Sequence, residues 1–335
     1  MSVKPVRLGI VSTAGINRLV IPPAKASSLI DLVAVASRDA KRASEYAAKW
    51  EIGRSYGTYE ELLADPGVEA LYVSLPNHEH VPWTLRALEA GKHVLCEKPL
   101  TRHPAEIETV WGLAESRGLV VCEAFMWRHN PQTKRFAELV AAGAIGELQF
   151  VRSLFSFAMS DPATNVRMKP ELDGGSLMDV GTYCVSGIRL LAGEPEVVYG
   201  EQLIGGESVD VRFSGLMRNS GGVRGLFCSS FESPSRKELE AIGSEGVLRL
   251  RDPWHAWRGG IELQRDEEAE SERIEVETGD SYQLELEDFA RAVRGEKQPL
   301  LGRADALGQA RALAALYISA EEERPVDLSE LDREV

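Results

Sequence analysis

Short apolar runs alternate with helical stretches through the first third of the chain. Runs rich in β-branched residues are followed by segments whose apolar residues recur every three or four positions, and this order repeats several times. Such alternation predicts βαβ units and therefore a parallel sheet. The predicted strands are 6–12, 32–37, 70–75, 93–97 and 120–122, and the predicted helices are 16–21, 40–50, 59–63, 80–90 and 104–117.

The pattern changes after residue 122. A helix is expected over 130–142, and from 147–157 onwards polar and apolar residues alternate as they do in antiparallel strands. The longest alternating region is 197–276, where Gly-rich turn signals separate the runs. This region predicts an open, mostly antiparallel sheet with one polar and one apolar face. Two amphipathic helices, 281–294 and 303–320, are expected to follow.

Composition narrows the class of protein. The 335 residues carry a net charge of −14, which argues against nucleic acid or an anionic membrane as a partner. No signal peptide or bilayer-spanning run is visible, so we expect a cytoplasmic protein. The cysteines lack Cys-x-x-Cys spacing and are expected to be buried and reduced: Cys96, Cys122, Cys184 and Cys228. His78 and His80 flank Glu79, but no further ligand cluster has matching spacing, and no metal is predicted.

The first predicted strand ends in a turn of small residues before a helix. Free N–H groups and the helix dipole at such a turn favour an anion such as a pyrophosphate. The usual three glycines are replaced by Ser12, Ala14 and Asn17, so a plain turn remains an alternative. At the end of the second strand, Ser37 and Arg38 suit a 2′-phosphate, although Asp39 follows them. We therefore predict NADP as the cofactor, with NAD and a solvated surface arginine as the alternatives.

Lys98 is the first candidate for chemistry. It follows the buried strand 93–97, and Pro99 restricts its backbone, so the lysine is aimed by the turn; an ordinary solvated lysine is the alternative. Asp179 and Tyr183 lie four residues apart and would share one face of a helix, where both could address one polyol. A tyrosine, with a pKa of about 10, becomes a useful base only beside a cation, which Lys98 and an oxidised nicotinamide would supply. The alternative is that Tyr183 packs in a core and Asp179 pairs locally.

Other polar residues are expected near a ligand because of their positions. Asn77 and His80 follow the predicted strand 70–75, and loops at the carboxyl ends of parallel strands line the ligand crevice. Arg128 and Arg167 could bind substrate hydroxyls and are equally credible as surface cations.

Four motifs occur along the chain in a characteristic order. They are Leu75-Pro76-Asn77-His78-Glu79-His80, Glu97-Lys98-Pro99, Glu123-Ala124-Phe125-Met126-Trp127-Arg128 and Gly174-Gly175-x-x-x-Asp179-x-Gly181-x-Tyr183. Across nearly the whole chain this set resembles the Gfo/Idh/MocA oxidoreductases, in the branch of NADP-dependent xylose-type aldose dehydrogenases and dimeric dihydrodiol dehydrogenases. The resemblance implies a Rossmann domain (1–122), a substrate-binding and oligomerisation α+β domain (123–300), and a C-terminal helix and tail (301–335) packing near the first domain.

The resemblance also implies roles for residues. Lys98 would be the catalytic lysine, Asp179 a substrate-positioning acid and Tyr183 the general acid/base. The expected cofactor-binding residues are Ser12, Thr13, Ala14, Gly15, Ile16, Asn17, Ser37, Arg38, Leu75, Pro76, Asn77, His80, Glu97, Lys98, Trp127 and Arg128. The expected substrate-binding residues are Lys98, Arg128, Arg167, Asp179 and Tyr183.

The expected reaction is hydride transfer between NADP and a hydroxyl carbon of a sugar or cyclic diol, in a homodimer or homotetramer formed through the second sheet. Two alternatives remain. One is a non-catalytic nucleotide- or sugar-sensing regulator on the same fold, which could dispense with Lys98 and Tyr183. The other is an aldose-aldose oxidoreductase that never releases its cofactor.

Overall fold

The chain forms two compact units, which we call unit 1 and unit 2. The computed structural model describes residues 4–257, 259–265, 270–277 and 279–333. Unit 1 comprises Met1–Thr101, Ala105–His129 and Asp280–Leu307, and unit 2 comprises Arg102–Pro104, Asn130–Gly279 and Gly308–Val335. The domains expected from the sequence (1–122, 123–300, 301–335) are consecutive, whereas these units interleave. Residues 280–307 join unit 1 because helix α8 (Ser281–Val293) packs against helix α1 (Asn17–Ala26).

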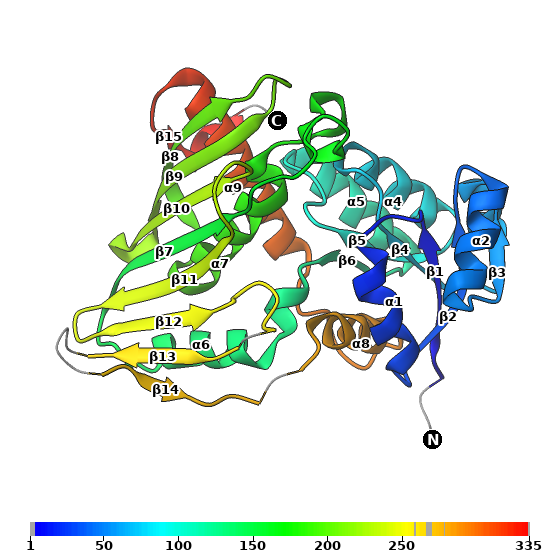
Figure 1. Ribbon diagram of the computed structural model, residues 1–335, viewed down its shortest axis with the longest axis horizontal. Helices are drawn as coiled ribbons and strands as arrows, with labels where there is room; N and C mark the ends of the chain where they lie inside the picture. Colours follow the sequence, from blue (N-terminus) through cyan, green and yellow to red (C-terminus); the bar gives the residue numbers. More distant parts are fainter. Residues whose placement is uncertain (1–3, 258, 266–269, 278, 334–335) are drawn as a thin grey trace. The chain divides into compact units, whose positions relative to one another are not determined.

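Unit 1 is built on a parallel sheet of six strands in the order β3-β2-β1-β4-β5-β6 (Figure 1). Its central strands are covered on both faces, so their apolar residues are continuous rather than alternating, as in Ala70–Val73, where every residue is buried. This confirms the predicted parallel sheet; only the short β3 had no sequence signal. The strands are β1 (Val6–Val11), β2 (Ile30–Ala36), β3 (Arg54–Tyr56), β4 (Ala70–Val73), β5 (His93–Glu97) and β6 (Val121–Ala124).

The helices of unit 1 follow the predicted pattern with one extension. Helix α1 was expected to stop before Pro22 and Pro23, but both prolines lie inside it. Pro fixes a φ that a helix accepts, and the buried Ile21 and Ala24 offset the lost N–H bonds by packing. The other helices are α2 (Ala40–Trp50), α3 (Tyr59–Ala64), α4 (His80–Glu89) and α5 (Pro104–Arg117).

Unit 2 is built on a sheet of nine strands in the order β14-β13-β12-β11-β7-β10-β9-β8-β15. Every pair in it is antiparallel except β7 with β10, which confirms the predicted, mostly antiparallel sheet. The strands are β7 (Leu148–Ser156), β8 (Pro195–Ile204), β9 (Asp210–Asn219), β10 (Arg224–Ser230), β11 (Arg236–Gly243), β12 (Val247–Arg251), β13 (Ile261–Gln264), β14 (Glu272–Ile274) and β15 (Val326–Asp327).

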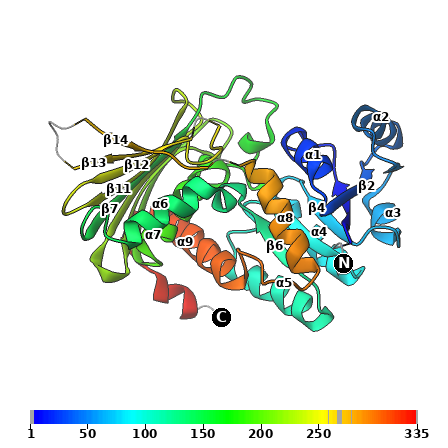
Figure 2. The ribbon, with the colours of Figure 1, turned by 90° about the horizontal axis from the view of Figure 1, so that it is seen from below.

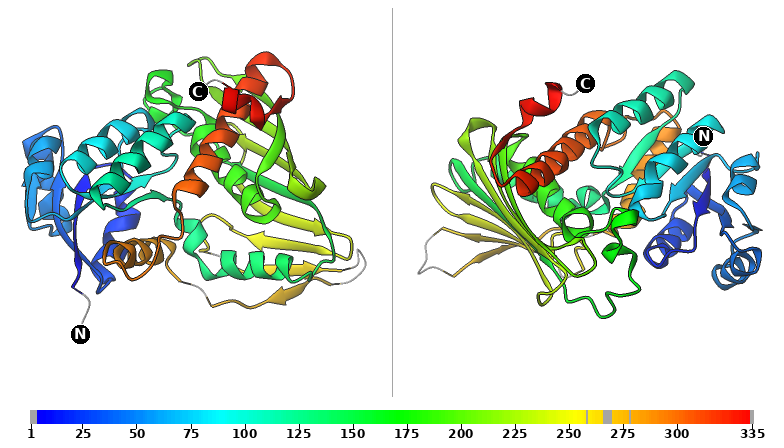
Figure 3. Two further views of the ribbon diagram at one scale, coloured as in Figure 1. Left: turned by 180° about the vertical axis from the view of Figure 1, so that it is seen from behind. Right: turned by 90° about the horizontal axis from the view of Figure 1, so that it is seen from above.

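Three helices lie along one face of this sheet: α6 (Pro131–Ala141), α7 (Thr182–Ala192) and α9 (Arg303–Glu322) (Figure 2, Figure 3). Side chains that point towards them are buried, as Phe213 and Phe227 are. We call the opposite side the open face, where Leu216 and Leu226 are each 41% exposed. In the described ranges, no helix is both long and apolar enough to cross a bilayer.

One cysteine does not follow the sequence expectation. Cys96, Cys122 and Cys184 are buried and reduced as expected, but Cys228 is exposed. It lies on β10, where side chains alternate between the two sides of the sheet, and Phe227 takes the buried side. The apolar neighbours of Cys228 in the sequence therefore point away from it.

Candidate active site

Lys98 lies in a tightly held turn at the end of β5 in unit 1. Its backbone N–H donates to Oε2 of Glu97 over 3.2 Å, and the N–H of Leu100 donates to Oε1 of Glu123 over 2.8 Å. The Lys98-Pro99 peptide bond is cis. Two carboxylates thus accept the N–H groups on either side of Pro99, which fixes the direction in which the half-buried Lys98 leaves the backbone.

His80 connects two loops that the sequence places near a ligand. Its Nδ1 lies 2.7 Å from the carbonyl oxygen of Pro99, and its Nε2 lies 2.8 Å from that of Leu75. Burial lowers the pKa of His80 to about 4, and the hydrogen bonds to the two carbonyls, which favour the charged ring, oppose that shift. With 1% of the residue exposed, His80 holds the turn at Lys98 in place from inside the unit.

A group of acidic and phenolic side chains lies behind this turn. The hydroxyl of Tyr72 donates a short hydrogen bond to Oε1 of Glu97. Glu285, on α8, is 2% exposed, and burial raises its pKa well above the usual range, helped by the charges of Glu97 and Asp288. Burial also raises the pKa of Tyr282, one helical turn before Glu285, with Glu97 and Glu285 adding to the shift. The sequence analysis did not find this group, because its members come from separate elements.

The small-residue turn between β1 and α1 retains the features of an anion site without its glycines. Ser12 has φ 103°, a conformation that glycine usually supplies, and its hydroxyl accepts the N–H of Ala14 over 3.1 Å. The side-chain amide of Asn17 donates to the carbonyl of Ser12 over 3.0 Å, which closes the turn. The N–H groups of Gly15 and Ile16 have no acceptor among the described residues. Unpaired donors at the start of a ten-residue helix suit a pyrophosphate.

Asp39, which complicated the NADP prediction, has a structural role. Its carboxylate accepts the backbone N–H of Arg42 over 2.6 Å and so caps α2. Arg38 is exposed at the end of β2. Burial raises the pKa of the nearby Tyr59, and the positive charges of Arg38 and Arg42 oppose that shift. Two guanidinium groups therefore lie near Tyr59, and planar cations of this kind suit a phosphate.

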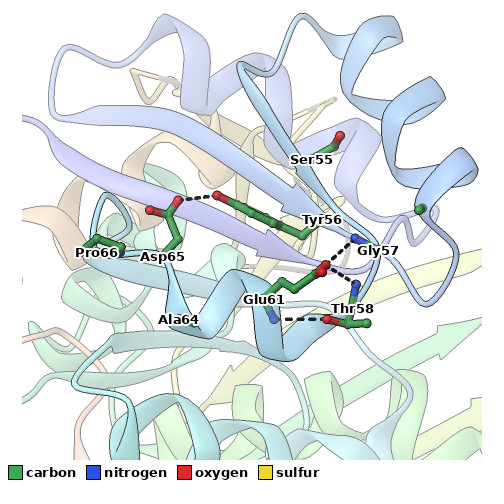
Figure 4. Close-up of a pocket in the computed structure, with 9 residues that line it drawn as sticks. Ser55, Tyr56, Gly57, Thr58, Glu61, Ala64, Asp65 and Pro66 are labelled. Carbon is green, nitrogen blue, oxygen red and sulfur yellow. Dashed lines mark hydrogen bonds between the residues drawn. The ribbon is translucent and has the colours of Figure 1, made fainter.

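An open hollow of about 800 Å³ lies on the outer edge of unit 1, near the end of β3 (Figure 4). Within it, the N–H groups of Gly57 and Thr58 both donate to Oε2 of Glu61, and the hydroxyl of Tyr56 donates to Asp65 over 2.9 Å. These polar groups are therefore hydrogen-bonded to one another. The Glu61 contacts cap α3, and the Tyr56 contact lies at the end of β3. The hollow contains none of the predicted catalytic residues. Its lining consists of Ala40, Ser55, Tyr56, Gly57, Thr58, Glu61, Ala64, Asp65 and Pro66.

Asp179 and Tyr183 lie in one helical segment of unit 2. The sequence predicted a regular helix there, but Leu177–Gly181 form a π-helical turn that continues into α7. Nε of Arg167 donates to Oδ2 of Asp179 over 2.6 Å, so the structure pairs two of the predicted substrate-binding residues with each other. An inserted π turn often marks a functional site.

Tyr183 is 7% exposed and lies among aromatic rings. The centroid of its ring is 5.5 Å from that of Phe155, in an edge-to-face arrangement, and 5.7 Å from that of Trp254. The rings fix the side chain of Tyr183. Such fixed placement is what a residue that transfers a proton needs.

Arg128, a predicted cofactor and substrate residue, is paired within unit 1. Its guanidinium donates to Oδ1 of Asp305 over 3.2 Å and lies over the ring of the buried Trp127. The sequence gave no indication of Asp305. Within the described part of the chain, no three His, Cys, Asp or Glu side chains are arranged to hold a metal ion.

Two acidic residues near these sites were assigned no role by sequence analysis. Glu123 belongs to one of the four motifs. Its place near the end of β6 was the sequence feature that could have indicated a role at the ligand edge of the sheet. Asp210, the first residue of β9, accepts the N–H of Leu177 at the start of the π turn over 2.7 Å. Nothing in the sequence around Asp210 distinguishes it from a solvated strand residue.

Comparison with known families matches both parts of the chain. Residues 6–125 match the model of an oxidoreductase family with an NAD-binding Rossmann fold, and residues 133–249 match a GFO/IDH/MocA C-terminal domain.

Characterised relatives cover most of the chain. D-xylose 1-dehydrogenase (NADP(+)) 2 of Haloferax volcanii is 39% identical over 325 residues, covering 96% of this chain and 99% of the relative. Trans-1,2-dihydrobenzene-1,2-diol dehydrogenase of Mus musculus is 36% identical over 232 residues, 68% of each protein. Among solved structures, the 3-ketoreductase KijD10 of Actinomadura kijaniata, in complex with NADP and TDP-benzene, is 29% identical with a TM-score of 0.89, covering 94% of this chain and 98% of that one.

The buried Glu285 predicts a pH dependence of stability. Because its pKa is raised in the folded protein, the folded state holds the proton more tightly than the unfolded chain does. The contribution of Glu285 to the free energy of unfolding is therefore fully present below its ordinary pKa of 4.5. It is lost as the pH rises towards the pKa of Glu285 in the folded protein. Relative to the parent, Glu285→Gln should gain about 1 kcal/mol or more in unfolding free energy between pH 5 and pH 8. Urea unfolding at the two pH values measures this difference.

The control for this experiment is Glu296→Gln, which changes an exposed residue just after the same helix. It should leave the difference between pH 5 and pH 8 unchanged. An equal pH response in the parent and in Glu285→Gln would contradict the prediction.

Proposed function

This chain belongs to the Gfo/Idh/MocA family of oxidoreductases, and on that premise we propose that it moves a hydride between NADP and a hydroxyl-bearing carbon of an aldose or a related cyclic diol. It is an NADP-dependent oxidoreductase. The observation that carries the choice of catalytic residues is the turn at Lys98, where Glu97 and Glu123 hold the backbone on both sides of Pro99. A surface lysine without a role would not need this support.

Each catalytic residue has a distinct task in the proposal. The phenolate oxygen of Tyr183 takes the proton of the reacting hydroxyl in oxidation, and the resulting phenol returns that proton in reduction. The ammonium of Lys98 binds the reacting oxygen and stabilises the negative charge that develops as the proton leaves. Asp179 accepts a hydrogen bond from a neighbouring hydroxyl of the substrate, and the hydrogen bond from Arg167 orients its carboxylate. The nicotinamide, when bound, accepts or supplies the hydride.

The proposed cofactor contacts lie in unit 1. The unpaired N–H groups of Gly15 and Ile16 would hold the pyrophosphate, and Ser37 with Arg38 would hold the adenosine ribose and its 2′-phosphate. Arg42 adds positive charge beside Arg38. The loop after β4 and the Lys98 turn, joined by His80, would receive the nicotinamide end.

We also propose that two copies of the chain associate through the open face of unit 2, in the cytoplasm. One cross-strand row on this face contains Arg249, Glu240 and Arg152, which form ion pairs of 2.8 Å on each side of Glu240. The row continues across β10 and β9 with Leu226 and Leu216. Exposed leucines next to charges that are paired within the sheet favour contact with a second copy of the same surface.

Removal of the proposed proton donor should abolish turnover without loss of the cofactor. Tyr183→Phe and Lys98→Ala should each lower kcat by about 100-fold or more, because proton transfer and charge stabilisation are lost. NADP affinity should change little in Tyr183→Phe. Steady-state kinetics with a panel of aldoses, inositols and dihydrodiols, read at the absorbance of the reduced nicotinamide, measures this. Tyr56→Phe, a hydroxyl deletion in unit 1, is the control, and full activity in Tyr183→Phe would overturn the role of the tyrosine.

Cofactor choice should depend on the arginine at the end of β2. Arg38→Ala should weaken NADP binding by about 10- to 100-fold, since a charge-assisted contact to the 2′-phosphate is removed, and should leave NAD binding nearly unchanged. Fluorescence titration with NADPH and NADH measures both affinities. Arg86→Ala, which removes an exposed arginine stacked on Trp83, is the matched control. An unchanged NADP-to-NAD ratio in Arg38→Ala would contradict the assignment.

Association through the open face predicts a charge-sensitive oligomer. The pair Leu216→Glu and Leu226→Glu should convert the oligomer into smaller species, because both copies would have to bury their new carboxylates in the contact. Light scattering after size-exclusion chromatography measures the mass. Val166→Glu changes another exposed apolar residue outside the sheet and should leave the mass unaltered. A mass unaffected by both leucine changes would place the contact elsewhere.

A further inference from the structure

The position of Asp179 and Tyr183 depends on how their helical segment begins. The segment starts at a Gly174-Gly175 turn, enters the π-helical turn at Leu177 and continues as α7. A π turn is not the conformation that helical hydrogen bonding selects by itself, so contacts from outside the segment are needed to hold it. Two of these contacts come from the buried Asp210.

Asp210 supports the start of the segment with both oxygens of its carboxylate. Its Oδ2 accepts the hydroxyl of Ser176 over 2.8 Å and the N–H of Leu177 over 2.7 Å. Its Oδ1 accepts the hydroxyl of Tyr317, on α9, over 3.0 Å. Asp210 is 3% exposed, so these three donors replace water at the carboxylate.

The glycines of the turn allow the carboxylate and the main chain to approach closely. Gly175 has φ +116°, and a Cβ placed there would lie 2.1 Å from Oδ1 of Asp210. A Cβ on Gly174 would lie 2.4 Å from the carbonyl oxygen of Arg167, and that carbonyl accepts the N–H of Gly175 over 2.8 Å. Because Arg167 also binds Asp179, the turn, the arginine and the acid form one connected set.

We propose that Asp210 and Tyr317 form a positioning pair, which fixes the start of the helical segment and thereby sets the placement of Asp179 and Tyr183. The inference rests on the proposed function, because it assigns a role relative to those two residues. Asp210 does not touch the substrate in this proposal. It acts through Ser176 and Leu177, and Tyr317 keeps its carboxylate in place.

The charge state of Asp210 makes the proposal measurable. The ionised carboxylate accepts all three hydrogen bonds, whereas a protonated one must donate in place of one of them. Burial raises the pKa of Asp210 to about 6, and its hydrogen-bond donors oppose the shift. The charged groups around the pair are Arg102, whose guanidinium lies 4.7 Å from the ring centre of Tyr317, and Asp173, which is 3.8 Å from Arg102. Protonation of Asp210 below this pH should loosen the turn and lower kcat.

The test uses the full-length enzyme in the direction of carbonyl reduction by NADPH. In this direction Tyr183 donates a proton, so low pH does not remove its active form. The variants are Asp210→Asn, Tyr317→Phe and Ser319→Ala. Ser319 is the matched control, because its buried hydroxyl also lies on α9 but accepts the N–H of Gly200 on β8. Initial rates between pH 5 and 8 give kcat and KM, and NADPH affinity is measured by fluorescence.

Three results are expected. Asp210→Asn should lower kcat at pH 7.5 by about 10-fold, with NADPH affinity unchanged, and should lack the fall in rate near pH 6. Tyr317→Phe should move that fall to higher pH by about half a unit, because one donor that favours the ionised carboxylate is lost. Ser319→Ala should match the parent. If Asp210→Asn does not fold, the shift in Tyr317→Phe decides the question.

Two outcomes would overturn the positioning role. One is a parental kcat and pH profile in both Asp210→Asn and Tyr317→Phe; the other is a lower rate in Tyr317→Phe with an unmoved pH profile, which a merely structural role would produce. Failure of the proposed function is distinguishable, since Tyr183→Phe would then retain the parental rate in the same assay.

Discussion

Carboxylates that accept backbone N–H groups hold the turns that carry the candidate catalytic residues of each unit. In unit 1, Glu97 and Glu123 accept the N–H groups of Lys98 and Leu100. In unit 2, Asp210 accepts the N–H of Leu177. At each turn the main chain leaves the regular ladder of a strand or helix, so its N–H groups would be unpaired without these side chains. The candidate catalytic residues are thus placed by the acids that hold their turns.

These acids carry an energetic cost that the surrounding structure offsets. Removing a carboxylate from water disfavours its charged form, as the raised pKa of Asp210 indicates. Hydrogen bonds from backbone, hydroxyl and phenol groups recover part of that cost at Asp210. A turn held in this way has little freedom to reorganise, and catalysis benefits when groups are already placed for the developing charge.

The two faces of the nine-stranded sheet differ in what they contact. One face packs against α7 and α9, and its glycines allow close approach: a Cβ on Gly200 would lie 2.6 Å from the carbonyl oxygen of Leu316. That close contact holds α9, which carries Tyr317, against the sheet. The open face combines an ion-pair ladder around Glu240 with the exposed Leu216 and Leu226. The same strands therefore support α7 and α9 on one face and carry the surface proposed for self-association on the other.

Patterns within a few residues determined much of this protein. Alternating runs predicted both sheets, and the predicted bounds of 40–50, 93–97 and 104–117 agree with α2, β5 and α5. Local spacing also singled out Lys98, Asp179 and Tyr183 as candidates. The predictions of helices and strands succeed because the periodicities and turn residues behind them act over about one turn of chain.

The tertiary structure decided which partner each polar group finds. It pairs Arg167 with Asp179, Arg128 with Asp305, and the N–H of Leu177 with Asp210. It also exposes Cys228, which the sequence expectation had buried. These contacts join residues 12 to 177 positions apart, and no local pattern records them. The sequence alone indicates which residues can do chemistry, whereas the packing of distant elements determines how each one is held, because hydrogen bonds and burial depend on proximity in space.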